Sequence, residues 1–143
     1  MRKFVIFFIL IVIIVIFATF MYFNYKVEKE KLDEKNYEFE VYLNKEIYGT
    51  DVATLINKAS YKNRKNQVEQ DKNGKYIDNG NNSINIDIKM LDDDKTYNME
   101  KFYKSGTMLF AEYYKNIKFK VMKIDYHEET KLVKYIFIEQ ITK

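Results

Sequence analysis

The sequence predicts an α+β fold: an N-terminal transmembrane helix and stalk, then one small domain with an antiparallel sheet of four to six strands and two helices on one face. Three observations predict this class. Residues 4–23 are continuously apolar, residues 83–90 alternate between apolar and polar side chains, and residues 52–59 carry an apolar stripe at helical spacing. We therefore expect four parts, which are a basic tail (1–3), a transmembrane helix acting as signal anchor (4–23), a helical stalk (24–36) and an α+β domain (37–143).

The apolar run FVIFFILIVIIVIFATFMYF has twenty residues without a charge, a proline or a glycine. As a helix it is about 30 Å long, which matches the hydrocarbon core of a bilayer. A small domain cannot surround a helix that is apolar on every face, so a core helix is a poor alternative. A cleaved signal peptide usually has about 7–15 apolar residues and a small-residue cleavage site. This run instead ends in Phe20, Met21, Tyr22 and Phe23, so we expect an uncleaved anchor in the cell membrane.

The orientation of a single-pass chain follows from its flanking charges. Arg2 and Lys3 precede the run, whereas four lysines follow it within residues 24–36. Taken literally, this count slightly favours a cytoplasmic C-terminal domain. However, a short basic segment before the first apolar run is typical of signal anchors, and long domains translocate largely regardless of charge. We therefore predict an extracytoplasmic C-terminal domain.

The part of the chain after Phe23 has 120 residues, enough for one domain. Without Arg2 and Lys3, the 24 basic side chains become 22, against 21 acidic ones, so the domain has no polyanion-binding signature and no nucleic-acid partner is expected. There is no cysteine, which excludes disulfides, thiolate chemistry and Cys-ligated metals.

Local patterns predict the elements of the domain in order. Residues 24–36 have too few apolar positions for a coiled coil and predict a solvated helical stalk, and residues 37–43 alternate as a strand does. A helix should begin after Gly49 with Thr50 as its N-cap and Asp51 in its first turn, carry Val52, Leu55, Ile56 and Ala59 on one face, and end near Lys62.

The second half of the domain begins with two turns. Asn73-Gly74 predicts a hairpin, and residues 79–82 turn the chain into the strand 83–90. Asn98 should cap a helix whose apolar stripe comprises Met99, Phe102, Tyr103, Leu109, Phe110 and Tyr113. Gly106 marks either a break or a close contact, and residues 107–115 stay open between helix and strand. Residues 117–126 and 132–141 predict two final strands, the last one central.

One group of side chains could support transition-metal or acid–base chemistry. His127 is the single histidine and precedes Glu128 and Glu129. Adjacent residues of a strand point to opposite faces, and no second histidine or cysteine completes a transition-metal site. We therefore interpret these residues as a solvated hairpin turn.

Other polar segments favour structural interpretations. Residues 71–82 fail as a calcium loop, because Lys75, Tyr76 and Asn82 replace the oxygen ligand, glycine and glutamate needed at positions 5, 6 and 12. The acidic run 92–94 could hold a hard cation weakly but is typical of a loop. The remaining candidates are Lys118, Lys120 and Lys123, read as the outer face of an amphipathic strand rather than a single-stranded nucleic-acid surface, and the sequon Asn81-Asn82-Ser83.

Two blocks, Gly49 to Ala59 (GTDVATLINKA) and Phe119 to Glu139 (FKVMKIDYHEETKLVKYIFIE), resemble uncharacterised small single-pass membrane proteins of Gram-positive bacteria. The resemblance implies a bacterial envelope setting and brings no catalytic motif. The layout also resembles type IV pilins and pseudopilins, in which an apolar N-terminal helix leads into an α+β head. This chain lacks the glycine before the apolar run and the acidic residue within it that mark those proteins.

No nucleophile elbow, phosphate loop or zinc-protease helix is present, so we predict no catalytic, cofactor-binding or metal residue and no enzyme. The expected function is a membrane-anchored accessory or structural subunit, pilin-like in layout, of an envelope assembly or secretion apparatus. Its partners would be the lipid bilayer, through residues 4–23, and other membrane or envelope proteins. The alternative is a membrane-tethered sensor or regulator that binds a peptide or small ligand.

Overall fold

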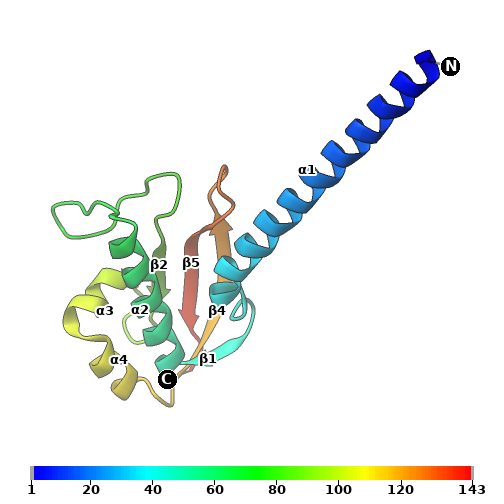
Figure 1. Ribbon diagram of the computed structural model, residues 1–143. Helices are drawn as coiled ribbons and strands as arrows, with labels where there is room; N and C mark the ends of the chain where they lie inside the picture. The colour runs from blue at the N-terminus through cyan, green and yellow to red at the C-terminus, as the bar shows by residue number, and fades with distance from the viewer. Residues whose placement is uncertain (1, 143) are drawn as a thin grey trace. The chain divides into compact units, whose positions relative to one another are not determined.

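The computed structural model of the protein describes residues 2–142 and divides the chain into two compact units, 1–35 and 36–143. The first unit is formed by helix α1 (Arg2–Glu40), which supplies its last turns to the second. We call the second unit, residues 36–143, the head. Figure 1 shows the elements of the head in colours from cyan to red. The outermost residues of the expected parts 1–3 and 37–143, Met1 and Lys143, lie outside the described residues.

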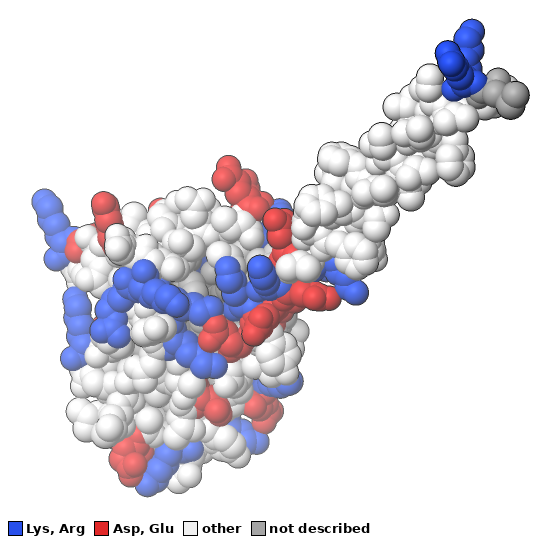
Figure 2. Space-filling model, viewed as in Figure 1, with Lys and Arg blue, Asp and Glu red and all other residues white. Residues whose placement is uncertain are grey.

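Helix α1 is one uninterrupted helix that includes the expected apolar segment and stalk. Side chains in residues 4–23 are exposed, and the surface of this segment is uncharged between the basic N-terminal side chains and the charged stalk (Figure 2). The hydroxyl of Thr19 donates to the Val15 carbonyl within the helix, 2.7 Å away, so this polar group is satisfied locally. One described helix, α1, is therefore long and apolar enough to cross a membrane.

The strand expected at residues 37–43 is wrong, because α1 continues to Glu40. The alternation of apolar and acidic side chains in residues 37–43 does not correspond to the side of the chain that is buried. Tyr37 is 66% exposed, whereas Asn36 and Phe39, three residues apart on one side of the helix, are buried in the head. Burial of one helical face therefore prevails over the local strand pattern.

The head contains a five-stranded sheet, within the expected range of four to six. Its strands are β1 (Glu46–Tyr48), β2 (Asn85–Lys89), β3 (Thr96–Asn98), β4 (Lys118–Tyr126) and β5 (Val133–Gln140), in the order β1-β4-β5-β2-β3. The prediction of a purely antiparallel sheet is wrong, since β2 and β5 pair in parallel. The central position of β5 is confirmed. A strand with two neighbours buries a longer apolar run, which explains its sequence.

Three helices rather than two cover one face of this sheet (Figure 1). They are α2 (Gly49–Lys65), α3 (Met99–Ser105) and α4 (Thr107–Tyr113). Gly106, with φ of +97°, separates α3 from α4 and settles residues 107–113 as helix. Asn98 caps α3 by accepting the Lys101 N–H, as expected.

Helix α2 confirms the predicted stripe, since its four apolar side chains at positions 52, 55, 56 and 59 are fully buried. Its N-cap is Tyr48 instead of Thr50, and the Asp51 carboxylate accepts the Tyr48 N–H at 3.0 Å. The helix also continues past Lys62 to Lys65. Asp51 thus stabilises the start of the helix, two residues earlier than predicted.

The core lies between the helices and the sheet. The alternating strand predicted at 83–90 is confirmed, because Ile84, Ile86, Ile88 and Met90 are all buried. Strand β4 breaks the alternation, since the register shifts between Val121 and Lys123 and leaves Met122 as an extra residue. Such a β-bulge turns the following side chains to the other face.

The turn predicted at Asn73-Gly74 is present, although only an isolated bridge between Gln70 and Tyr76 flanks it. Helix α3 holds this loop in place. The Glu100 carboxylate accepts the Tyr76 N–H at 3.0 Å, and the Lys104 ammonium donates to the Asn73 carbonyl. Side chains of α3 provide hydrogen-bond partners for these backbone groups. The loop is therefore held in place without long flanking strands.

Candidate functional site

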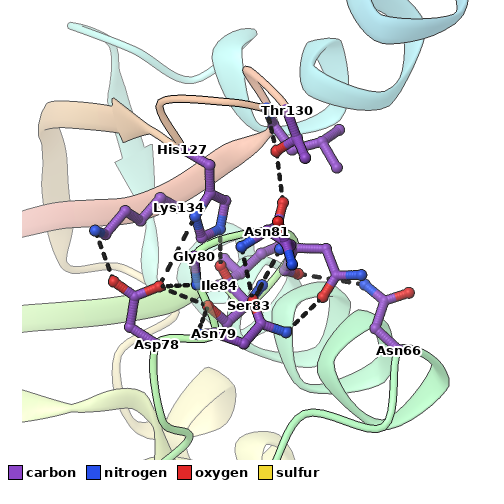
Figure 3. Close-up of polar contacts among 12 residues, drawn as sticks. Asn66, Asp78, Asn79, Gly80, Asn81, Ser83, Ile84, His127, Thr130 and Lys134 are labelled. Atoms are coloured by element: carbon purple, nitrogen blue, oxygen red, sulfur yellow. Dashed lines mark hydrogen bonds and ion pairs between the residues drawn. The ribbon is translucent and has the colours of Figure 1, made fainter.

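Polar side chains from three separate segments meet beside the β4–β5 turn (Figure 3). The segments are the loop 78–84 that precedes β2, the turn 127–132, and the start of β5. They surround a depression of about 380 Å³ lined by residues 79–81, His127, Glu128, Glu129 and Lys134. We call it the His127 depression. It is the strongest candidate for a ligand site among the described residues.

The loop 78–84 is fixed by its own side chains. The Asn79 carbonyl oxygen Oδ1 accepts the N–H groups of Asn81, Asn82 and Ser83 at 3.0–3.1 Å. The Ser83 hydroxyl donates to Asp78 Oδ1 and accepts the Asn79 N–H. Short polar residues are suited to such turns because they replace missing backbone partners. The loop therefore presents a preformed wall to the depression.

His127 is buried, with only 1% of its surface exposed, so the expectation of a solvated turn is wrong for this residue. The loop 78–84 covers it. Its Nε2 lies 2.8 Å from the Ser83 carbonyl oxygen, which can only accept, so Nε2 carries the proton. In the neutral ring Nδ1 is then an acceptor. It has no hydrogen-bond partner among the described residues, and Asp78 Oδ1 lies 3.8 Å away.

Lys134 reaches the same place because of a second β-bulge. The adjacent residues Asp125 and Tyr126 pair with Tyr135 and Val133, so Lys134, which lies between these two partners, is the extra residue. Its ammonium lies 2.6 Å from Asp78 Oδ2. The hydrogen bond from Lys134, followed by the one from the Gly80 N–H, lowers the pKa of Asp78 from 3.8 to about 2. The same bond raises the pKa of Lys134.

The depression has an excess of negative charge. Glu128 and Glu129 line it with two carboxylates against the one ammonium of Lys134, which pairs with the neighbouring Asp78. Glu128 and Glu129 are exposed, and neither forms an ion pair with another described residue. Across residues 2–142, no three His, Cys, Asp or Glu side chains are grouped so as to hold a metal ion.

The turn beside the depression also holds the end of α1. Asn36 donates from Nδ2 to the Lys131 carbonyl at 2.9 Å, and its Oδ1 accepts the Val133 N–H at 3.1 Å. On the other side of the turn, toward the loop 78–84, the Thr130 hydroxyl donates to the Asn81 carbonyl. The turn 127–132 thus links the wall of the depression to the last turns of α1.

The carboxylates of the other segments considered as cation sites have partners within the protein. In the acidic run 92–94, each carboxylate has a different partner: Tyr114 for Asp92, Tyr97 for Asp93 and Lys89 for Asp94. Asp71 Oδ1 accepts the N–H groups of Asn73 and Lys75 within its own turn. These carboxylates are used in turns and at strand ends.

The lysines of β4 carry no unbalanced charge. Lys118 pairs with Glu46 at 2.9 Å and Lys123 with Asp125 at 2.7 Å, while Lys120 lies opposite Glu139 in the sheet register. The amphipathic-strand interpretation explains these residues, since cross-strand pairs stabilise a solvated sheet face.

Helix α4 presents an unexpected apolar surface. Leu109 and Tyr113, predicted on the buried stripe, are 71% and 77% exposed, and Met108 is 83% exposed. The break at Gly106 starts a new helix whose buried side is set by Phe110 instead. We call Met108, Leu109 and Tyr113 the α4 surface. Contiguous exposed apolar side chains are typical of protein contacts.

Sequence reasoning missed Asp78, Lys134 and Asn36. No local pattern marks them, because each acts through a partner brought close by the fold. Comparison of this chain with protein-family models, curated proteins and solved structures finds no match.

Proposed function

We propose that this protein is a membrane-anchored, non-enzymatic subunit of a bacterial envelope assembly or secretion apparatus. The observation that carries the proposal is the single helix α1, apolar enough to cross a bilayer, whose last turns are part of the folded head. Asn36 and Phe39, in these last turns of α1, are buried in the head. A purely transient targeting segment does not need such a connection.

The head, in this proposal, lies outside the cytoplasm and binds an apolar face of another envelope protein through the α4 surface. This contact is supported by the side chains of Met108, Leu109 and Tyr113, which are uncharged and yet exposed to solvent. The layout of an apolar N-terminal helix leading into an α+β head is also that of pilin-like subunits. Lateral contacts of residues 4–23 with other helices would add to the assembly.

Photo-crosslinking in intact cells tests the role of the α4 surface. A photoreactive amino acid at position 109 should form a discrete protein adduct, whereas the same group at the exposed loop position 72 should not. Met108→Glu in the position-109 variant should abolish the adduct, because a charge would have to be desolvated in an apolar contact. Equal adducts at both positions, or no adduct at 109, would contradict the proposal.

A second candidate function, a membrane-tethered sensor, is favoured by the His127 depression. Its wall is linked through the turn 127–132 and Asn36 to the end of α1. A ligand that moved this turn would act directly on the backbone groups that hold the helix. Such a coupling requires that the ligand interact differently with two positions of the turn.

A further inference from the structure

Beside the His127 depression, His127 Nδ1 lies near Asp78 Oδ1 without a hydrogen-bond donor of its own, whereas Oδ1 already accepts the Gly80 N–H and the Ser83 hydroxyl. His127 Nδ1 is an acceptor in the neutral ring, because Nε2 donates to Ser83. Asp78 Oδ1, 3.8 Å away, is a carboxylate oxygen. Buried polar atoms in native structures are nearly always paired, so an orphaned nitrogen at the edge of a depression points to a missing donor.

The charges around this position define the kind of donor. The two carboxylates of Glu128 and Glu129 and the one ammonium of Lys134 leave the lining of the depression negatively charged, so a positively charged donor is favoured over an anion. A primary ammonium group has three N–H donors and no acceptor. It can therefore bond a carboxylate and an imidazole nitrogen at the same time.

Lys134 already places one ammonium here. Its Nζ bonds Asp78 Oδ2, while its side chain is 40% exposed, as is that of Asp78. An exposed ion pair of this kind contributes little to stability and exchanges readily with solvent. The bulge directs the Lys134 ammonium to Asp78. This ammonium therefore occupies a position for a cation, and another cation can displace it.

We propose that the His127 depression binds a ligand carrying a primary ammonium group, which displaces Lys134 from Asp78 and donates to Asp78 and to His127 Nδ1. Glu128 and Glu129 attract the ligand by their charge. The ammonium belongs to a small free amine or to a lysine side chain of a partner protein. This inference is independent of the α4 surface and goes beyond the proposed assembly role.

Binding can be measured by amide NMR on the full chain in neutral detergent micelles, with n-butylammonium as the probe and n-butanol as its uncharged counterpart. We expect saturable shifts at Gly80, Ser83 and Glu129 with n-butylammonium only. Lys134→Met should strengthen binding by at least about threefold, because the internal competitor is removed. Asp78→Asn should weaken it by a similar factor or more.

Several results would overturn the proposal. They are equal shifts with n-butanol, shifts centred on the acidic loop 92–94, or weaker binding in Lys134→Met. If Asp78→Asn fails to fold, Lys134→Met still tests the proposal. We expect this second variant to fold, because the Lys134 side chain is 40% exposed. A titration with N-acetyl-lysine methylamide distinguishes the two possible sources of the ammonium group, a small free amine and a lysine side chain of a partner protein. Tighter binding than n-butylammonium identifies a protein lysine, and weaker binding identifies a free amine.

Discussion

Two buried asparagine side chains, Asn36 and Asn63, each bond both an N–H and a carbonyl of a distant segment. Asn63 donates from Nδ2 to the Ile84 carbonyl at 2.7 Å and accepts the Ile84 N–H at 2.8 Å. Asn36 does the same with Lys131 and Val133. A carboxamide offers one donor group and one acceptor in the geometry of a peptide, so each asparagine replaces a neighbouring strand.

Asn63→Ala should lower the free energy of unfolding by about 2–4 kcal/mol, because it leaves the N–H and the carbonyl of Ile84 buried and unpaired. Urea denaturation of the full chain in detergent micelles, followed by tyrosine fluorescence, measures this change. Asn66→Ala is the matched control, since the exposed Asn66 makes one bond of 3.3 Å to Asn82. Its effect should stay within about 0.5 kcal/mol. Equal losses in both variants would contradict this role of Asn63.

These residues also show why the sequence predicts part of the site and not the rest. The asparagines are separated from their partners by 21 to 97 residues, so no local pattern could identify them. His127 illustrates the same limit. Its place in a turn between two strands was predictable, but its burial depends on the loop 78–84, which only the folded chain brings over it.

Periodicity predicted those elements whose buried face stays constant. Helix α2 and strand β2 are of this kind. It failed where the backbone changes phase. In β4 the bulge at Met122 brings Ile124 to the buried face, and the bulge at Lys134 turns that side chain toward Asp78. A period of two cannot continue through such an extra residue.

Helix α4 provides a sharp test, because two adjacent residues should behave differently. Phe110 is 6% exposed and its ring contacts those of Phe102, Tyr114 and Phe119. Phe110→Ala should lower the free energy of unfolding by about 3–5 kcal/mol. Leu109→Ala removes an exposed side chain and should change it by less than about 0.5 kcal/mol.

Urea denaturation of the two variants in the same micelles measures both values. A large loss in Leu109→Ala would mean that the apolar stripe predicted from spacing packs in the core after all. A small loss combined with loss of the crosslinked adduct at position 109 would assign Leu109 to partner contact instead.

The whole molecule combines an apolar helix, a charged helical continuation and a folded head in one chain. The helix that the length of the apolar run predicted is present. The parallel pairing of β2 with β5 was not predictable in the same way. It depends on which strands lie beside the central one, and this order is decided by long-range packing.

The central claim, a membrane anchor with its head outside the cytoplasm, is tested most directly by thiol labelling. The chain has no cysteine, so Lys72→Cys in an exposed loop and Lys3→Cys before the apolar run each provide a single thiol. A membrane-impermeant maleimide should label Lys72→Cys in intact cells and Lys3→Cys only after lysis, both at full-length mass in the membrane fraction. Labelling in the reverse order, or a chain that has lost position 3, would contradict the account.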